Sequence, residues 1–222
     1  MNYIETCKEI IKTPSNFYRK MSTTGGYTDP LTFVAISCLI NGILIVLVHY
    51  GMSKINGMYG WDFIFIPMTG MSTIDVMYSW ALIIFIYILV APILSIIFTF
   101  IAAAVQYPIY KIFGGTGSYE GTVRVISYSA AVMVLSWIPI LGLILSIYSL
   151  YLNIVGGMIV HKVSMGKSTV AVLISIVLFA IVAFAAGLII GGLFFGAIDI
   201  MSDQPIRSAS QFRDVIINWF MN

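Results

Sequence analysis

Few residues in this chain have the type and spacing needed for chemistry. The two histidines, His49 and His161, stand at the ends of different apolar stretches, which a helical bundle would place on opposite membrane faces. A shared metal site is therefore not expected, and neither histidine belongs to a His-Glu-x-x-His motif. No Gly-x-Ser-x-Gly nucleophile motif occurs either. We expect no catalytic residues, no metal and no cofactor.

The acidic residues point the same way. All nine Asp and Glu lie outside the stretches that we assign to the membrane below. A proton relay or an intramembrane aspartyl pair would need carboxylates within the bilayer. We therefore expect that the protein is not an enzyme.

Two glycine-containing segments suggest phosphate or anion binding. Residues 165–168 end in Gly-Lys-Ser, but His161 stands where a phosphate-binding loop requires Gly, so we expect Ser168 simply to cap a helix. Residues 114–121 are Gly-rich, and a nest of backbone N–H groups there could hold an anion. A flexible turn with Ser118 as the cap of the next helix is the favoured interpretation.

The composition is that of a membrane protein. Hydrophobic residues make up 60% of the 222 residues and charged residues only 9%, whereas about a quarter of the residues of soluble domains are charged. The net charge of +2 comes from scattered Lys and Arg, which argues against nucleic acid. Cys7 and Cys38 suggest no disulfide framework. We predict an all-α, polytopic membrane protein.

Two apolar stretches in the first half predict two spans. Residues 31–50 are uncharged and reach roughly the 30 Å of the hydrocarbon layer. Residues 76–110 are also uncharged, and we place the second span at 80–105. Pro92 lies inside it and is expected to kink the helix rather than break it, with Ser95 and Thr99 nearby as hydrogen-bonding groups.

The second half predicts three spans, which makes five. Residues 125–160 are uncharged, and a single helix of that length would measure about 54 Å, nearly twice the hydrocarbon thickness. Residues 137–142, Trp-Ile-Pro-Ile-Leu-Gly, offer a turn. The third span is then expected at 122–137, the fourth at 139–160 and the fifth at 168–198.

The distribution of Lys and Arg predicts a cytoplasmic N-terminus and an outer C-terminus in the cell membrane. With five spans, eight basic residues lie inside and three outside. The inner ones are Lys8, Lys12, Arg19, Lys20, Lys111, Arg124, Lys162 and Lys167, and the outer ones are Lys54, Arg207 and Arg213. A four-span chain with one long third helix gives the same ratio, so it is length that favours five.

Amphipathic helices are expected on both sides of the membrane domain, which covers residues 31–198. In the N-terminal segment 1–30, Ile4, Cys7 and Ile11 form an apolar face. In the tail, 199–222, apolar residues recur with helical spacing from Phe212 to Phe220. Each helix would lie on the membrane surface or dock a partner, and the surface is favoured.

Small and amide residues indicate how the spans pack. Ala183, Gly187 and Gly191 form a stripe on the fifth span that lets helix backbones approach, within the chain or in a homo-oligomer. Asn41 and Asn153 lie in mid-span, where an unpaired amide is costly, so each should find a partner inside the bundle.

The inner face holds the candidate binding residues. Arg124 is the one formal charge inside an expected span, and we expect its side chain to snorkel to the headgroups. It is the first candidate for contact with an anionic headgroup or a protein partner. The other candidates on this face are Lys111, His161, Lys162 and Lys167.

Several short motifs resemble those of prokaryotic-type Yip1-domain membrane proteins. They are residues 14–17 (Pro-Ser-Asn-Phe), 114–119 (Gly-Gly-Thr-Gly-Ser-Tyr), Thr122, Arg124 and Val125 with Tyr128-Ser129, 138–142, and 155–157 with His161. The resemblance implies five spans and a cytoplasmic N-terminus. In eukaryotes the family is linked to vesicle traffic and to prenylated small GTPases.

Two functions are compatible with these residues. The first is a non-enzymatic adaptor or membrane-organising protein that acts through its cytoplasmic face on membrane lipids or a protein partner. The alternative is a small transporter or channel, in which Asn41, Tyr128 and Asn153 would line a polar path beside the Pro92 kink.

Overall fold

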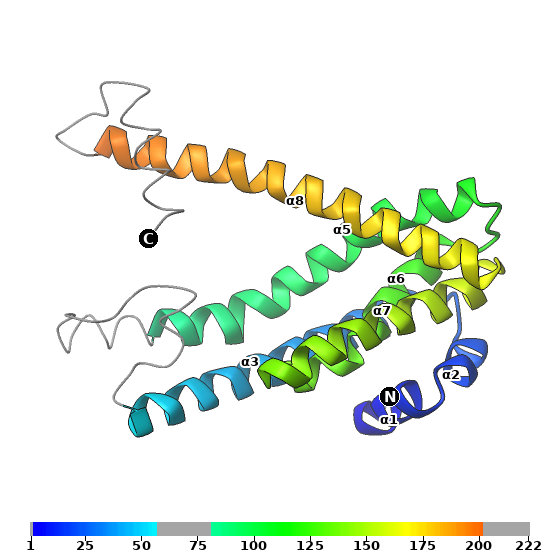
Figure 1. Ribbon diagram of the computed structural model, residues 1–222, viewed down its shortest axis with the longest axis horizontal. Helices are drawn as coiled ribbons and strands as arrows, with labels where there is room; N and C mark the ends of the chain where they lie inside the picture. Colours follow the sequence, from blue (N-terminus) through cyan, green and yellow to red (C-terminus); the bar gives the residue numbers. More distant parts are fainter. Residues whose placement is uncertain (1, 57–80, 202–222) are drawn as a thin grey trace. The chain divides into compact units, whose positions relative to one another are not determined.

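The computed structural model describes residues 2–56 and 81–201, which form helices and connecting turns without any strand (Figure 1). The predicted all-α class is therefore confirmed for this part of the chain. The tail helix expected over 199–222 falls almost wholly outside it. In chain order the elements are α1 (Tyr3–Lys12), α2 (Pro14–Lys20), α3 (Thr28–Asn56), the π-helix η1 (Phe85–Val90), α5 (Ala91–Ile112), α6 (Tyr119–Ser129), the 3₁₀ helix η2 (Ala130–Leu135), α7 (Pro139–His161) and α8 (Met165–Met201).

Four described helices are long and apolar enough to cross a membrane. They are Thr28–Val48, Ala81–Ile112, Ile140–His161 and Met165–Ile189. They correspond to the first, second, fourth and fifth expected spans. The third expected span, 122–137, is instead built from the short α6 and the 3₁₀ turn η2, and neither qualifies by length.

The second of these helices continues through Pro92, as predicted. Proline has no N–H to donate and its ring crowds the preceding turn, which widens here into the π-helix η1. The N–H of Ala91 accordingly donates to the carbonyl of Ile86, five residues back. The hydroxyl of Ser95 donates to Pro92 O at 2.7 Å. The proline therefore distorts the helix locally without ending it.

Gly42 lets α3 approach this distorted turn. A Cβ atom at residue 42 would lie 2.5 Å from the carbonyl oxygen of Tyr87. The small side chains of Thr99 and Ala103 are also buried, and α3 packs along α5. Small residues thus allow close packing of these two helices.

Helices α6 and α7 form an antiparallel hairpin joined at residues 136–138, where the turn was predicted. The residues paired along the hairpin are Thr122 with His161, Val125 with Gly156, and Ser129 with Ser149. Pro139 occupies the first turn of α7, where its missing N–H costs no hydrogen bond.

Helix α6 is an interior element. It contacts α3, α5 and α7 (Figure 1), and eight of its eleven residues are buried. Its Val125 and Tyr128 share an apolar core with Phe33 of α3 and Leu152 of α7. The segment expected to face lipid as the third span therefore has its sides covered by other helices of the same chain.

The N-terminal helix forms, but a different face is buried from the one predicted. Ile10 is fully buried and Tyr3 and Cys7 pack beside it, whereas Ile4 and Ile11 are exposed. The predicted pairing of Cys7 with Ile4 and Ile11 is wrong because Tyr3, Cys7 and Ile10 share the helical face that meets the bundle. The Tyr3 hydroxyl lies 2.7 Å from Ser37 Oγ.

The chain divides into two compact units, Met1–Ile176 and Val177–Asn222, and α8 is shared between them. In the second unit Gly187 is exposed, and no described atom lies within 4 Å of a Cβ built on Gly187 or Gly191. The packing role of the stripe Ala183, Gly187 and Gly191 stays a prediction.

Candidate functional site at the polar end

The candidate site lies at the end of the helices formed by residues 22–26, 113–118 and 161–167, which we call the polar end. Ser118 caps α6, as predicted, because its Oγ accepts the N–H of Gly121 at 3.0 Å. Within the Gly-rich segment, the N–H of Gly115 donates to Tyr110 O and that of Thr116 donates to His161 O. These N–H groups hold the turn against α5 and α7, so they are not free to bind an anion.

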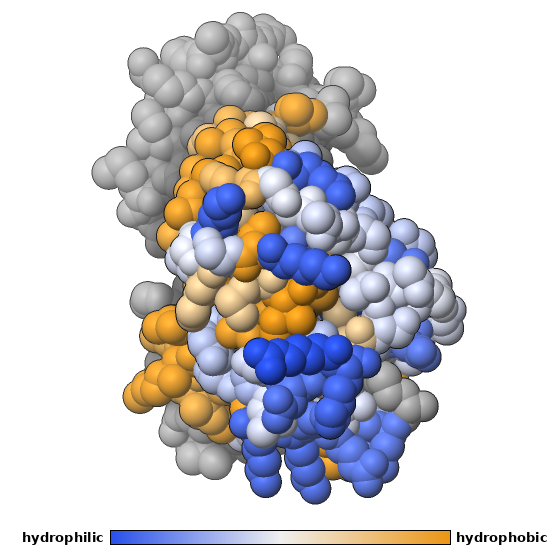
Figure 2. Space-filling view, turned by 90° about the vertical axis from the view of Figure 1, so that its right-hand side faces the viewer, coloured by the Kyte–Doolittle hydropathy of each residue, from blue (hydrophilic) through white to orange (hydrophobic). Residues whose placement is uncertain are grey.

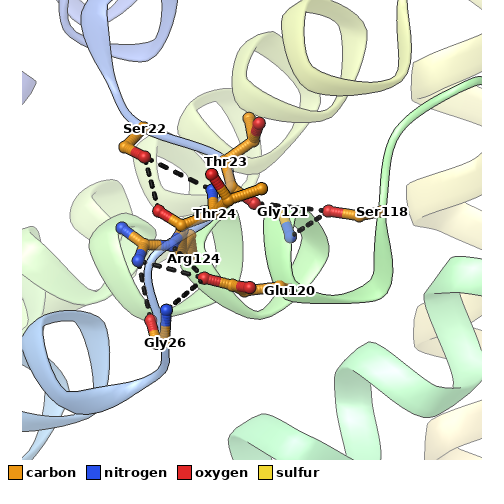
Figure 3. Close-up of polar contacts among 8 residues, drawn as sticks. All are labelled: Ser22, Thr23, Thr24, Gly26, Ser118, Glu120, Gly121 and Arg124. Atoms are coloured by element: carbon orange, nitrogen blue, oxygen red, sulfur yellow. Dashed lines mark hydrogen bonds and ion pairs between the residues drawn. The ribbon is translucent and has the colours of Figure 1, made fainter.

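Glu120 and Arg124 clamp the chain segment that precedes α3 (Figure 3). Arg124 Nη2 donates to Gly26 O at 2.7 Å and to Glu120 Oε1 at 3.1 Å, and its Nε lies 3.2 Å from the same oxygen. Glu120 Oε1 also accepts the N–H of Gly26 at 2.8 Å. Gly25 and Gly26 have φ of 112° and 89°, values that favour glycine, so this segment can bring both backbone groups of Gly26 to the ion pair.

The burial of Arg124 corrects the prediction made for it. Its side chain is only 6% exposed and that of Glu120 is 21% exposed. The side chain turns inward to its ion pair because Glu120 lies one helical turn earlier on the same face. The snorkelling prediction is therefore wrong, and Arg124 holds the polar end together from within.

His161 is likewise buried and not available at the surface. Its ring stacks on Tyr110 with centroids 4.0 Å apart, and its Nε2 lies 2.9 Å from Thr122 Oγ1. Among the described residues Nδ1 has no hydrogen-bond partner, and a Cβ on Gly117 would lie 2.7 Å from it. The imidazole thus joins α5, α6 and α7 beneath the Gly-rich turn.

The three lysines predicted for this face are exposed. Lys167 Nζ donates to Phe113 O at 3.1 Å, Lys111 Nζ lies over the Tyr107 ring, and Lys162 ends α7 in the left-handed conformation. Figure 2 looks onto this end and shows hydrophilic side chains over much of the described surface. The five predicted contact residues therefore separate into a buried pair and an exposed trio.

The polar residues predicted for mid-span tie helices together. Asn41 Oδ1 accepts from Ser136 Oγ at 3.1 Å, and Asn153 Oδ1 accepts from Gln106 Nε2 at 2.9 Å. The partners expected for both amides are thus confirmed. Tyr128 is buried and its ring packs against Phe17.

Ser168 does not cap the fifth span, contrary to prediction. It is fully buried, where its Oγ donates to Ile154 O at 2.7 Å and lies 2.9 Å from the Tyr110 hydroxyl. The cap is Ser164, whose Oγ accepts the N–H of Lys167 at 3.4 Å. Helix α8 begins one turn earlier than predicted, which carries Ser168 inside.

Sequence reasoning missed Glu120, Gln106 and Tyr110 as parts of this end. The spacing of Glu120 and Arg124, four residues apart with the acid first, was a readable signal for a helical ion pair. Gln106 and Tyr110 carried none, because their partners come from α7 and α8, far away in sequence. Burial also raises the pKa of the Tyr119 hydroxyl, which donates to Phe100 O at 2.9 Å.

Several long apolar helices around a buried polar centre define a multi-pass helical membrane protein. Within residues 2–56 and 81–201 no three His, Cys, Asp or Glu side chains gather in a way that could hold a metal ion. The family model of the Yip1 domain matches residues 8–202, and the chain belongs to this family. No curated protein and no solved structure matches the chain.

Proposed function

We propose that the protein is a non-enzymatic membrane adaptor whose polar end faces the cytoplasm. The observation that carries this proposal is the exposed trio Lys111, Lys162 and Lys167, which the turn between α5 and α6 and the turn between α7 and α8 bring to one end. The buried ion pair and the stacked His161 fix the backbone beneath them. A rigid basic surface of this kind suits an acidic partner, whether protein or anionic headgroup.

The orientation follows from the excess of Lys and Arg on the side of the N-terminus, eight against three. The division is the same whether the chain crosses three times or five times from a start inside. The membrane-organising role that the family suggests requires a cytoplasmic surface of this kind.

Charge reversal tests the adaptor role. In the variant Lys111→Glu, Lys162→Glu and Lys167→Glu, we expect loss of retained anionic phospholipid, or loss of the adducts formed by a photo-reactive residue at Ile112. Ile112 is a suitable site because it is 80% exposed beside Lys111. The matched control, Lys8→Glu, Lys12→Glu and Arg19→Glu, makes the same change of charge away from this surface.

The comparison of the two triple variants decides the proposal. An adaptor surface loses the Ile112 adducts in the first variant and keeps them in the second. If lipid retention and adducts are unchanged by reversal at the polar end, the adaptor proposal is wrong.

The transporter alternative receives less support. The two amides that were candidates for its path each accept a hydrogen bond from another part of the bundle, Asn153 from Gln106 of α5 and Asn41 from Ser136 in the hairpin turn. Such pairs are what helix packing in lipid uses. Flux of a solute through reconstituted vesicles that stops in Asn153→Leu would favour transport instead.

A further inference from the structure

Helix α1 lies well away from the polar end, along the side of the bundle. The Tyr148 hydroxyl donates to Ile11 O at 2.7 Å, and the Tyr3 hydroxyl lies 2.7 Å from Ser37 Oγ. Thirteen residues of α7 separate Tyr148 from His161, which corresponds to about 20 Å of helix. The helix therefore marks a level about 20 Å below the polar end.

The outer face of α1 is charged at this level. Glu5, Lys8 and Lys12 are exposed, and Ile4 and Ile11 are exposed between them. Charges on a lipid-facing surface do not enter the hydrocarbon, whereas an amphipathic helix lies at the interface with its apolar side chains in lipid. The hydrocarbon layer on this side therefore begins at about the level of α1.

The exposed apolar side chains give the same level independently. They run over residues 93–101 of α5 and 140–151 of α7. The hydrogen bond between Gln106 and Asn153 aligns these two helices, so both bands stop within about one turn of the level of Tyr148. In residues 22–42, 102–130 and 152–169, all of them described, the exposed large apolar side chains are only Ile112 and Met165.

We propose that the lipid boundary crosses the bundle at α1, and that α6, η2 and α7 form a re-entrant hairpin that enters the bilayer and returns without crossing it. From Tyr148 to Pro139, α7 has only about 14 Å left, under half of the hydrocarbon thickness. Helix α3 continues from Cys38 to Asn56, about 27 Å, which comes close to the roughly 30 Å of the hydrocarbon layer.

The turn of the hairpin makes the internal hydrogen bonds that a position within the bilayer requires. Non-helical backbone inside a membrane must have its polar groups satisfied by protein. The N–H groups of Ser136, Ile138 and Gly142 donate to carbonyls within the hairpin. Asn41 of α3 accepts from Ser136 Oγ, and about 22 Å of α3 still follows. Asn41 is thus hydrogen-bonded to a turn that lies in the middle of the membrane.

Three crossings and a hairpin leave the sidedness unchanged. The N-terminus stays inside, the C-terminus outside, and the basic residues still divide eight against three. The exposed lysines then stand beyond the headgroup layer, which is about 5–8 Å deep. On the adaptor function proposed above, their partner is an acidic protein rather than a headgroup.

Spin labels at two exposed positions test the depth without reference to any partner. In a Cys7→Ser and Cys38→Ser background, single labels replace Ile140, which is 78% exposed, and Ile4, which is 62% exposed. In liposomes we expect Ile140 about 12 Å below the boundary, with high accessibility to oxygen and low accessibility to a water-soluble nickel complex. Ile4 should report the depth of the headgroups. A label at Ile112 should be fully open to nickel.

If α6 with η2 crossed the bilayer and α7 crossed back, the pattern would be the opposite. Ile140 would then lie at the outer headgroups and Ile4 within the hydrocarbon. Either result overturns the proposal. Membrane-impermeant maleimide added outside intact cells gives a second measurement. Ile140→Cys should stay unlabelled while Lys54→Cys, which follows the first crossing, reacts. Labelling of both would also overturn the hairpin.

Discussion

Helix α6 and the helix Ala81–Ile112 lie against each other and have opposite character. Helix α6 carries Glu120, Thr122, Arg124 and two Ser, yet eight of its eleven residues are buried. The helix Ala81–Ile112 is far more apolar, and its most hydrophobic stretch contains no buried residue. In this protein the polar helix is the interior one, because lipid solvates the apolar one.

The difference shows what holds each region together. Apolar side chains gain little by moving from lipid to the interior, so the bundle depends on close packing and internal hydrogen bonds. At the polar end this means an ion pair, a stacked imidazole and glycines at close contacts. The lipid-facing side chains of α5 need no partners of this kind within the chain.

The largest expected effect comes from removing Arg124. In Arg124→Met the carboxylate of Glu120, 21% exposed, loses its ion pair and the Gly26 carbonyl loses its donor. Breaking a buried pair on one side costs about 3 kcal/mol of unfolding free energy. Thermal unfolding in mild detergent measures this loss.

Ile97→Leu is the matched change on the lipid-facing helix, where Ile97 is exposed. It should leave the unfolding midpoint unchanged. The double variant Glu120→Leu and Arg124→Met should lose less than Arg124→Met alone, since no unpaired charge remains. If Arg124→Met and Ile97→Leu lowered the unfolding midpoint equally, the two helices would not differ in what stabilises them.

Glycine substitutions should give the next largest effect. A Cβ on Gly156 would lie 2.7 Å from Val125 Cγ1, and one on Gly157 would clash with the Tyr110 hydroxyl. Either alanine overpacks the hairpin and should cost about 1–3 kcal/mol. Gly187→Ala, with no described atom within 4 Å, is the control and should not lower the unfolding midpoint. If Gly187→Ala lowered stability as much as Gly157→Ala, close contact at the glycine would not explain the loss.

The sequence predicted what depends on length and local chemistry. The positions of four long helices, the turn before Pro139 and the cap at Ser118 all followed from apolar runs and capping residues. The environment of Arg124 and His161 did not, because hydropathy cannot tell a side chain that reaches lipid headgroups from one that finds a partner in another helix. The buried face of α1 was missed for the same reason, since Tyr3 and Ile10 meet residues far along the chain.

A smaller loss is expected where two amides tie α5 to α7. Gln106→Leu leaves the Asn153 amide without its 2.9 Å partner and should cost about 1 kcal/mol, in the range of interhelical hydrogen bonds in membranes. The double variant with Asn153→Leu should recover part of that loss, because no polar group is then left unpaired. A double-mutant cycle on unfolding midpoints measures the coupling, and strictly additive losses would show that the two amides do not interact.

The smallest expected effect concerns the docking of α1, which is hydrogen-bonded to α3 and α7. Burial raises the pKa of the Cys7 thiol, so at neutral pH the docked helix holds less thiolate than a free thiol and reacts slowly with maleimide. Ser37→Ala with Tyr148→Phe removes two hydrogen bonds to α1 but leaves Cys7 and its neighbour Tyr3 intact.

In a Cys38→Ser background we expect Cys7 to react severalfold faster in this double variant, and its curve of rate against pH to shift to lower pH. The sign follows from the raised pKa, since undocking returns the thiol to water and to its ordinary value, which increases the thiolate at any pH below it. The unfolding midpoint should hardly change, because only α1 detaches. Identical rate curves in both proteins would mean that these two hydrogen bonds do not hold the helix on the bundle.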